Sequence, residues 1–413
     1  QRRGLLQKDT VLCTALIGMY IKCGALEKAR KIFNQLQIKH VSSWTTLIAG
    51  YTEHGLGDEA LKCFSQMQDE GVLPNTSTYI CVLKACGIVR SLEIGEDIDA
   101  EIRKQGLLQK DIMIANALLG MYVKCGMLDK ASEVFKRILV PDVVSWTTLI
   151  AGYTEHGLAN EGLKCFKKMQ DGGIRPNSVT YICVMKACGM VGSLEIGEDM
   201  DVEIRKQGLL QKDIVLGNAL LDMYAKCGAL EKAQEVFEQL PERDVVSWNA
   251  LITGYSHLGE ISIVLDLYRE MTIEGIVPNP VSFLVLLTAC SHAGLLREGE
   301  KLFSEMRDVY RLTPSQEHYT CMLDLFGRAG HFDKAKALLQ MVSTSDHLPL
   351  FLAVLGACRK WVNVELGLWA FEQSIQLDKT CAAAYVCMKN IYAEVDMQTE
   401  VDSVEALRLK NKA

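Results

Sequence analysis

The sequence predicts an all-α protein in which helix pairs stack into a solenoid. The segment SWTTLIAGYTEHG occurs at 43–55 and again at 145–157, and the variant SWNALITGYSHLG follows at 247–259, each copy 102 residues after the last. The segment RKQGLLQKD recurs with the same period, at 103–111 and 205–213. A long fixed period indicates stacked supersecondary units rather than one globular core. Because the alternating apolar pattern of β-strands is not convincing anywhere in the chain, the repeated element is helical.

The composition fits such an array and excludes several classes of protein. Apolar residues make up 49% of the 413 residues, so a continuous core can run between neighbouring units. The net charge of −7 argues against a nonspecific polyanion binder, which normally has a basic surface. No run of about 18 apolar residues occurs, so we expect no membrane-spanning segment.

The cysteines bear on the redox state of the chain, and the first residue bears on whether the sequence is a fragment. The fifteen cysteines recur at repeat-locked positions such as Cys23, Cys125 and Cys227, where a small apolar side chain suits helix packing. Their odd number favours reduced thiols over a disulfide framework. The chain begins with Gln1 inside a repeat, so we expect a fragment whose targeting peptide lies outside this sequence.

The 102-residue block divides into three helix pairs. In 112–142, apolar residues such as Leu118 and Tyr122 precede the break KCG, and Val134 and Phe135 follow at helical spacing. This order predicts a helix, a glycine-containing turn and a second helix. The next two segments repeat the plan, which gives unit lengths of 31, 35 and 36 residues.

The same frame extends along the chain. A partial unit at 1–9 precedes ten helix pairs. The predicted pairs are 10–40, 41–75, 76–111, 112–142, 143–177, 178–213, 214–244, 245–279, 280–315 and 316–346.

The unit lengths, their order and motifs such as NALLDMYAKCGALEKAQEVFEQLPERD and EHYTCMLDLFGRAGHFDKA resemble the PLS class of plant pentatricopeptide repeat proteins. The resemblance covers nearly all of 1–380 and implies a right-handed superhelical α-solenoid of 31-residue S, 35-residue P and 36-residue L units. Residues 347–380 are similar to the first E motif that follows the last S unit. Residues 381–413 resemble a degenerate second E motif, whose end departs from the family pattern.

The resemblance implies that the fifth and last residues of each P and S unit read an RNA base. Hydroxyls, amides and carboxylates offer different donor and acceptor patterns to an unstacked base. The implied readers are Thr45 with Asn75 and Thr147 with Asn177 for adenine; Asn116 with Asp142 and Asn218 with Asp244 for uracil; Asn249 with Asn279 for cytosine, with uracil accepted; and Thr320 with Asp346 for guanine.

Helix capping is the alternative role for these side chains. Asp142 and Asp244 directly precede helix starts, where a carboxylate caps free amides and complements the helix dipole. Each pair taken alone fits capping better, but the pairs recur together in the 31- and 35-residue units, which favours base contact. The L units carry apolar residues at the fifth position, which cannot bond a base edge, so we expect spacers there. These residues are Ile80, Ile182 and Leu284.

Two further columns of residues fit an RNA ligand. The family resemblance implies that the second residue of each unit wedges between bases, although packing between helix pairs explains the pattern equally well. The wedge residues are Val11, Met113, Val144, Val215 and Val246, whereas Ser42 and Glu317 break the column. The thirteenth residue would lie near the phosphates, or would instead complement a helix C-terminus. This cationic column is Lys22, Lys124, Lys226 and Arg328.

The sequence contains few motifs that would indicate catalysis. Neither Cys-x-x-Cys nor His-x-Glu occurs, and zinc deaminases need both kinds of motif. We therefore expect no catalytic residue, cofactor or metal, and no DYW-type deaminase domain. The acidic segments GEDIDAEIRK at 95–104 and GEDMDVEIRK at 197–206 are expected to be solvated helix faces with acid–base pairs. His54 and His156 recur, but no nucleophile or metal ligand recurs with them.

The resemblance implies a sequence-specific single-stranded RNA-binding protein for organellar C-to-U editing, with a deaminase recruited in trans by the E-like segment. We expect a monomer of mitochondria or chloroplasts that reads A-x-U-A-x-U-C-x-G from 41–75 onward, with Thr14 and His40 of the first full unit unassigned. A decayed editing factor and a stabilising or splicing factor remain alternatives. A tetratricopeptide-type protein scaffold has uniform 34-residue units, which the 31/35/36 alternation disfavours.

Overall fold

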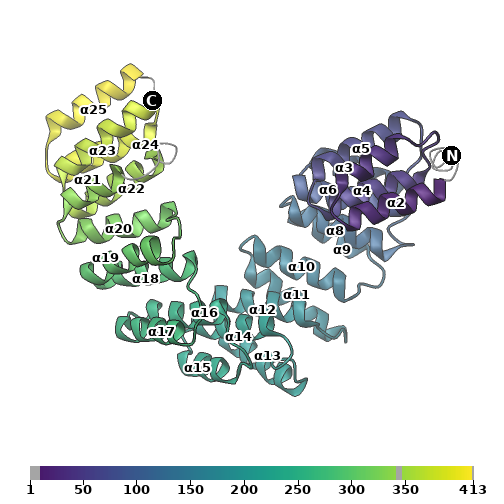
Figure 1. Ribbon diagram of the computed structural model, residues 1–413, viewed down its shortest axis with the longest axis horizontal. Helices are drawn as coiled ribbons and strands as arrows, with labels where there is room; N and C mark the ends of the chain where they lie inside the picture. The colour runs from purple at the N-terminus through teal and green to yellow at the C-terminus, as the bar shows by residue number, and fades with distance from the viewer. Residues whose placement is uncertain (1–9, 341–346, 412–413) are drawn as a thin grey trace. The chain divides into compact units, whose positions relative to one another are not determined.

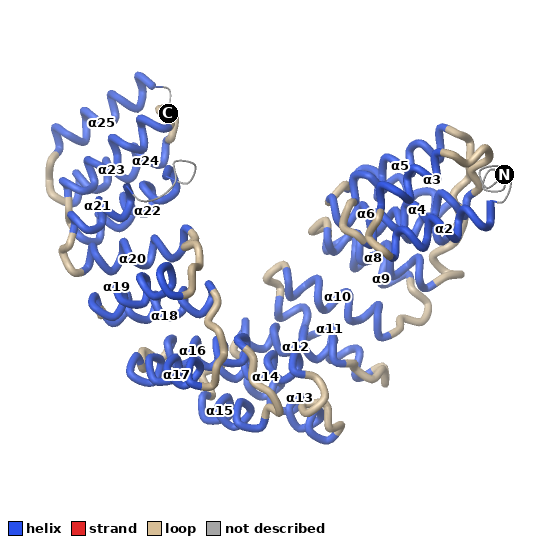
Figure 2. The backbone as a smooth tube through the Cα atoms, viewed as in Figure 1, coloured by secondary structure: helices blue, strands red, loops and turns tan. Residues whose placement is uncertain are grey.

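The computed structural model describes residues 10–340 and 347–411. These residues form 24 α-helices and one short π-helix, with no strand among them (Figures 1 and 2). Two compact units, residues 1–209 and 210–413, divide the chain. The prediction of an all-α solenoid of helix pairs is confirmed. None of the described helices has both the length and the apolar character of a membrane span.

Each pair consists of a first helix and a second helix joined by a short turn. The first helices are α2 (Thr10–Lys22), α4 (Val41–Glu53), α6 (Thr76–Val89), α8 (Ile112–Lys124), α10 (Val143–Glu155), α12 (Ser178–Val191), α14 (Ile214–Lys226), α16 (Val245–His257), α18 (Pro280–Ala293), α20 (Gln316–Arg328), α22 (His347–Trp361) and α24 (Ala382–Glu394). The second helices are α3 (Leu26–Asn34), α5 (Gly57–Asp69), α7 (Leu92–Lys104), α9 (Leu128–Arg137), α11 (Ala159–Asp171), α13 (Leu194–Lys206), α15 (Leu230–Gln239), α17 (Ile261–Ile273), α19 (Leu296–Ser304, followed by η1, Glu305–Val309), α21 (Phe332–Gln340), α23 (Val364–Leu377) and α25 (Gln398–Asn411).

Side-chain caps set where many of the first helices begin. The Asn75 side chain accepts from the backbone N–H of Thr78, and Asp142 does the same for Ser145, both at 2.8 Å. The third helical residue bonds back to the backbone of the cap in each case, which completes a capping box. Several first helices end before glycines in the left-handed region, such as Gly126 and Gly228 (both φ 76°), where a Cβ would cause strain.

Three tryptophan–phenylalanine pairs join consecutive helix pairs. In each pair, a phenylalanine on a second helix meets, edge to face, the tryptophan of the following first helix. The ring centroids lie 4.5 Å apart for Phe33 and Trp44, 4.5 Å for Phe135 and Trp146, and 4.7 Å for Phe237 and Trp248. Such contacts add about 0.5–1.5 kcal/mol beyond the buried area. The recurring tryptophan of the repeated segment is therefore a packing residue.

The acidic segments differ from expectation at one position each. Asp99 and Asp201 are buried rather than solvated. Asp99 receives two hydrogen bonds from Arg103, at 2.6 and 2.8 Å, and one from the Tyr122 hydroxyl at 2.7 Å, so it joins α7 to α8. Burial raises the pKa of Tyr122, and its bond to the Asp99 carboxylate raises it further. The predicted pairing with a basic residue one turn later holds, but the prediction of a solvated face is wrong at these two aspartates.

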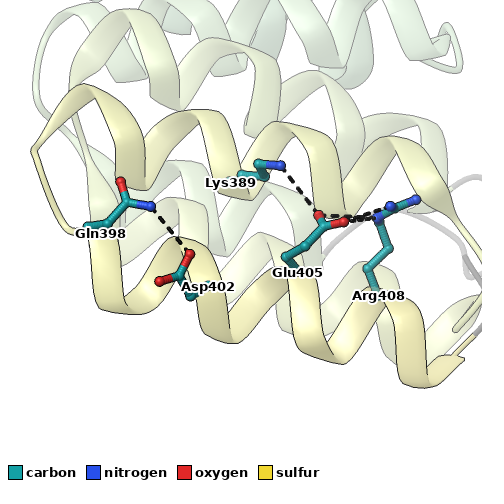
Figure 3. A network of polar contacts seen from close by, with 5 residues as sticks. All are labelled: Lys389, Gln398, Asp402, Glu405 and Arg408. Carbon is teal, nitrogen blue, oxygen red and sulfur yellow. Dashed lines mark hydrogen bonds and ion pairs between the residues drawn. The ribbon is translucent and has the colours of Figure 1, made fainter.

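The last segment also folds as a helix pair, α24 and α25. Glu405 of α25 bonds Arg408 Nη2 at 2.7 Å, within its own helix, and Lys389 of α24 at 3.4 Å, across the pair (Figure 3). Hydrogen bonds from Arg408 lower the pKa of Glu405. Tyr385 and Val404 contribute apolar burial to the same pair. Residues 382–411 thus retain the architecture of the units before them.

Candidate nucleic-acid interface

The second, fifth, ninth and thirteenth residues of a unit share one side of its first helix, because their spacing approximates the helical repeat. We call this side, together with the residue that caps the following first helix, the first-helix face. In the unit 112–142 these residues are Met113, Asn116, Gly120, Lys124 and Asp142. All five line one hollow of about 440 Å³, which is bounded by α6, α8 and α10. The structure therefore brings together the base-reading, wedge and cationic residues that the sequence predicts for this unit.

Three of the predicted reading pairs are in direct contact. In each, the amide nitrogen of the fifth residue donates to the Oδ1 atom of the last residue. The distances are 3.2 Å for Asn116 and Asp142, 3.0 Å for Asn218 and Asp244, and 3.2 Å for Asn249 and Asn279.

The two threonine–asparagine pairs are joined through a third side chain. Thr78 Oγ1 lies 2.8 Å from Thr45 Oγ1 and donates to Asn75 Oδ1 at 2.9 Å. Thr180 makes the equivalent bridge between Thr147 and Asn177, at 2.7 and 2.9 Å. Sequence reasoning missed these bridging hydroxyls. Their signal is a threonine three residues after the asparagine, the pattern of a capping box.

The sixth predicted pair is only half described. Thr320 Oγ1 donates to the Gln316 carbonyl at 2.9 Å, one turn back in α20. Asp346 lies outside the described residues.

A second hollow, of about 540 Å³, is lined by Thr45 and Asn75 together with Lys22.

Capping and ligand contact are compatible uses of the last residue. Asp142 Oδ1 accepts from Ser145 and Asn116, while no described residue bonds its Oδ2 atom. Asn75 likewise caps α6 through Oδ1, and no described residue accepts a hydrogen bond from its Nδ2 atom. The cap therefore orients the side chain and leaves its second polar atom without a partner in the described part of the chain. That atom is an acceptor in aspartate and a donor in asparagine.

The charge state of Asp142 follows from its partners. Burial alone would raise its pKa, but hydrogen bonds from the backbone N–H and hydroxyl of Ser145 and from the amide of Asn116 outweigh it. The pKa of Asp142 is therefore lowered, and the side chain is a carboxylate acceptor at neutral pH.

The wedge residues are exposed. Their exposed fractions are 77% for Val11, 65% for Met113, 50% for Val144, 58% for Val215 and 52% for Val246. Side chains this exposed contribute little to packing between helix pairs, which favours the wedge interpretation. Val179 (56%) and Val281 (54%) are exposed at the same position of two 36-residue units. Sequence reasoning missed both, although they share the 102-residue period with each other.

The cationic column divides into two kinds. Lys22 and Lys124 are exposed, and no ion pair involves them within 10–340 and 347–411. Lys226 is 2.6 Å from Asp222, and Arg328 is 2.8 Å from Asp324, each acid lying one turn earlier in the helix. All four cations are the last residues of their helices, where they also complement the helix dipole.

The histidines and cysteines were the remaining candidates for a metal site or a covalent link. No group of three His, Cys, Asp or Glu side chains is placed there to hold a metal ion, and no disulfide joins the cysteines. The Nδ1 atoms of His54 and His156 each lie 2.9 Å from a backbone carbonyl one turn earlier, that of Gly50 or Gly152. These histidines therefore serve helix ends.

Models of the pentatricopeptide repeat match most of the chain. The PPR repeat family matches residues 39–87, 141–190 and 243–292, and the single PPR repeat matches 11–41, 114–140, 218–245, 281–309 and 317–345.

Relatives from Arabidopsis thaliana match along almost the whole chain. The pentatricopeptide repeat-containing protein At1g06140, mitochondrial, is 34% identical over 97% of this chain and 71% of its own length. At2g03380, mitochondrial, is 35% identical over 94% of this chain and 56% of its own length. CRR2, chloroplastic, is 38% identical over 97% and 62%. The chain thus spans between about half and three quarters of these relatives.

Solved structures share the fold. The crystal structure of the pentatricopeptide repeat protein PPR10 from maize aligns with a TM-score of 0.66 at 17% identity, over 98% of this chain and 65% of PPR10. PPR10 in complex with an 18-nucleotide psaJ RNA element aligns with a TM-score of 0.71 at 16% identity, over 97% and 60%.

Proposed function

The chain belongs to the pentatricopeptide repeat family, and from that premise we propose that it binds single-stranded RNA in a sequence-specific way. One base is read by each 31- or 35-residue unit, through the fifth residue and the residue that caps the next unit. The 36-residue units, with Ile80, Ile182 and Leu284 at the fifth position, act as spacers. No catalytic residue takes part.

The oriented cap is the observation that carries this proposal. A capping aspartate leaves a carboxylate oxygen, which can accept the N–H of uracil or guanine. A capping asparagine leaves an amide N–H, which can donate to the ring nitrogen of adenine or cytosine. Whether the capping residue is aspartate or asparagine therefore divides the bases into those that present a ring N–H and those that present a ring nitrogen acceptor. The fifth residue, threonine or asparagine, then distinguishes the bases within each class.

The rest of the first-helix face suits the same ligand. Exposed valines and Met113 can stack between bases, since an apolar side chain gains free energy when a base covers it. Exposed lysines attract the phosphates. The family resemblance implies that the RNA runs 5′ to 3′ from the N-terminal to the C-terminal units. In the order of the units from 41–75 to 316–346, the proposed target is then 5′-A-x-U-A-x-U-C-x-G-3′.

We further propose a role in an organelle, as a site-recognition factor for C-to-U editing with the deaminase supplied in trans. The names of the relatives, mitochondrial or chloroplastic, support the organelle. The alternation of 31-, 35- and 36-residue units and the E-like segments 347–380 and 381–413 support the editing class. A partner deaminase would contact the E-like segments, and the chain would bind RNA as a monomer. The PPR10 complex shows RNA bound to a protein of the same fold, which supports RNA as the ligand.

A binding titration tests the RNA ligand and the reading order together. The nine-nucleotide RNA AxUAxUCxG is compared with an RNA of equal composition in which the read positions are shuffled. We expect the first to bind at least about tenfold more tightly, because each lost base contact costs about 1 kcal/mol or more. Equal affinities would contradict the base assignments, and binding to neither RNA would contradict the RNA proposal.

A single exchange tests one reading position. Asn218→Thr places a threonine beside Asp244, the combination assigned to guanine, so the preference at that nucleotide should change from uracil to guanine. Ile182→Val, at the fifth position of a 36-residue unit, is the matched control and should change no preference. A variant that still prefers uracil would show that Asn218 is not a reading residue.

A further inference from the structure

The hollow bounded by α18, α20 and α22 differs in chemistry from the two described above. Its volume is about 300 Å³, and its wall includes Thr320, Arg328, Lys360 and Trp361. The hollow at Asn116 is lined by Lys84 and Lys124 and the hollow at Thr45 by Lys22, but neither has an aromatic ring in its wall. The wall at α22 also has two cations, and it adds the ring of Trp361.

Trp361 packs closely against Gly327 of α20, which has no side chain. A Cβ atom on Gly327 would lie 2.1 Å from Cζ2 of Trp361, so the indole occupies space that only a glycine in α20 leaves free. The ring remains partly exposed, and the Phe332 ring lies near it, with the ring centroids 6.4 Å apart. The next residue, Val362, has φ 50°, a conformation that β-branched residues avoid. Trp361 is thus a ring on a rigid support, with surface left for a ligand.

The charges around the hollow favour an anion. Asp324 is already bound by Arg328 Nε at 2.8 Å and by the Ser291 hydroxyl at 2.6 Å. Lys360 is exposed and has no ion pair in the described residues, and His292 also lines the hollow. The permanent charges therefore sum to one positive charge beside an aromatic surface. A positive groove with an aromatic side chain is the usual arrangement for holding a single-stranded nucleotide without reading its base.

We propose that this hollow binds one further nucleotide of the same RNA, next to the base at Thr320. Its base stacks on Trp361, and its phosphate lies between Arg328 and Lys360. The subsite tolerates any base, because every base presents a stacking face. This inference rests on the proposed function, since it places the RNA along the first-helix side of α20 and α22.

The experiment extends the RNA. The affinity of the full chain is measured for AxUAxUCxG, for the same RNA with one added 3′ uridine, and for the RNA with an abasic nucleotide in that place. The uridine should raise the affinity on the order of tenfold, and the abasic nucleotide should add only the smaller part that comes from its phosphate. An equal gain from both would overturn the stacking role of Trp361.

Two variants test which residues produce the gain in RNA affinity from the added nucleotide. Trp361→Leu should abolish the difference between the uridine and the abasic extension, and Lys360→Gln should reduce the gain from both. Lys379→Gln, an exposed lysine between α23 and α24, removes the same charge elsewhere and should leave the gain intact. Because Lys360 is exposed, its variant tests the subsite even where Trp361→Leu unfolds α22.

The outcomes separate this inference from the proposed function. If the shuffled RNA still binds more weakly than AxUAxUCxG but the extension adds no affinity, the subsite is overturned, the function stands, and the hollow becomes a candidate for a protein ligand. If the nine-nucleotide RNAs bind equally, the reading order fails. A uridine gain that persists in both Trp361→Leu and Lys360→Gln would overturn the subsite.

Discussion

The proposed units 112–142 and 214–244 carry the same proposed reading pair in different surroundings. Asn116 with Asp142 and Asn218 with Asp244 make nearly the same hydrogen bond, at 3.2 and 3.0 Å. The ninth residue differs: it is Gly120 in one unit and Asp222 in the other, where the carboxylate binds Lys226 at 2.6 Å. The geometry of the proposed reading pair is therefore independent of the charge at the thirteenth residue, because the cap orients the pair whereas the charge depends on one residue a turn earlier.

The two asparagines also differ in how their oxygen is used. Asn116 Oδ1 accepts from the Ser145 hydroxyl at 2.6 Å. Asn218 Oδ1 is buried without a hydrogen-bond partner, because the Ser247 hydroxyl donates to the Asp244 carbonyl at 2.8 Å instead. An unsatisfied buried acceptor costs about 1–3 kcal/mol. The second unit thus holds an acceptor that a turn of the Ser247 hydroxyl can satisfy.

The largest expected effect comes from the capping aspartates. Asp142→Ala removes the cap of α10 and the base contact together, so we expect a loss of about 1 kcal/mol in the free energy of unfolding and of at least about fivefold in RNA affinity. Asp244→Ala should behave alike. Urea denaturation and RNA titration measure the two effects.

The matched control is Asp142→Asn, because asparagine caps a helix about as well as aspartate. This variant should keep its stability and lose its preference for uracil. Retention of the uracil preference in the asparagine variant would show that Asp142 serves α10 alone and reads no base.

The second effect concerns the cations. Each phosphate contact contributes about 0.7 to the slope of log affinity against log salt for a single strand. Lys124→Ala should lower that slope by about this amount, and Lys226→Ala should lower it less, because Asp222 already neutralises Lys226. Asp222→Ala should steepen the slope. Equal slopes for the two lysine variants would show that the ion pair opens when RNA binds.

The third effect concerns the stability of the chain and the residues that follow α6 and α12, the first helices of the units before 112–142 and 214–244. The residue that follows α6 is Arg90 with φ 57°, and the residue that follows α12 is the equivalent Gly192 with φ 70°. Since glycine adopts this left-handed conformation without the strain of a Cβ, Arg90→Gly should stabilise the protein by about 0.5–1 kcal/mol, and Gly192→Arg should destabilise it by a similar amount. Thermal unfolding compares both with Arg90→Ala, which keeps the strain. No gain for glycine would mean that the Arg90 side chain makes an offsetting contact.

The smallest effect is the pH dependence at Asp142. Its pKa in the folded chain is lowered, below about 3.9 for the unfolded chain. Its contribution to stability is therefore complete above the unfolded-state pKa, and it is lost as the pH falls through the folded-state pKa. Urea denaturation between about pH 5 and 2 should show a shallower acid loss in Asp142→Asn than in the wild-type chain. An unchanged acid limb would assign the loss to other carboxylates.

Much of the fold was predictable from the sequence because its signals are short in range. The helix starts of α8 and α10 follow from Asp111 and Asp142, whose side chains accept backbone N–H groups two or three residues later. The contact between the two members of a proposed reading pair was predictable only through the family pattern, since Asn116 and Asp142 are 26 residues apart. The bridges of Thr78 and Thr180, which span 33 residues, were not predicted. Nor was the burial of Asp99, because the partner Tyr122 belongs to the next unit.

The sequence by itself determined the period, the helix pairs and the residue types offered at the second, fifth, thirteenth and last positions. Capping, turn and periodicity signals act within about one or two helical turns, so they can be read in order along the chain. The tertiary structure alone decided that the Thr78 hydroxyl bridges Thr45 and Asn75. It also decided that Trp361, Arg328 and Lys360 share a hollow with α18. Those arrangements depend on how rotamers and neighbouring first helices pack, which no local pattern encodes.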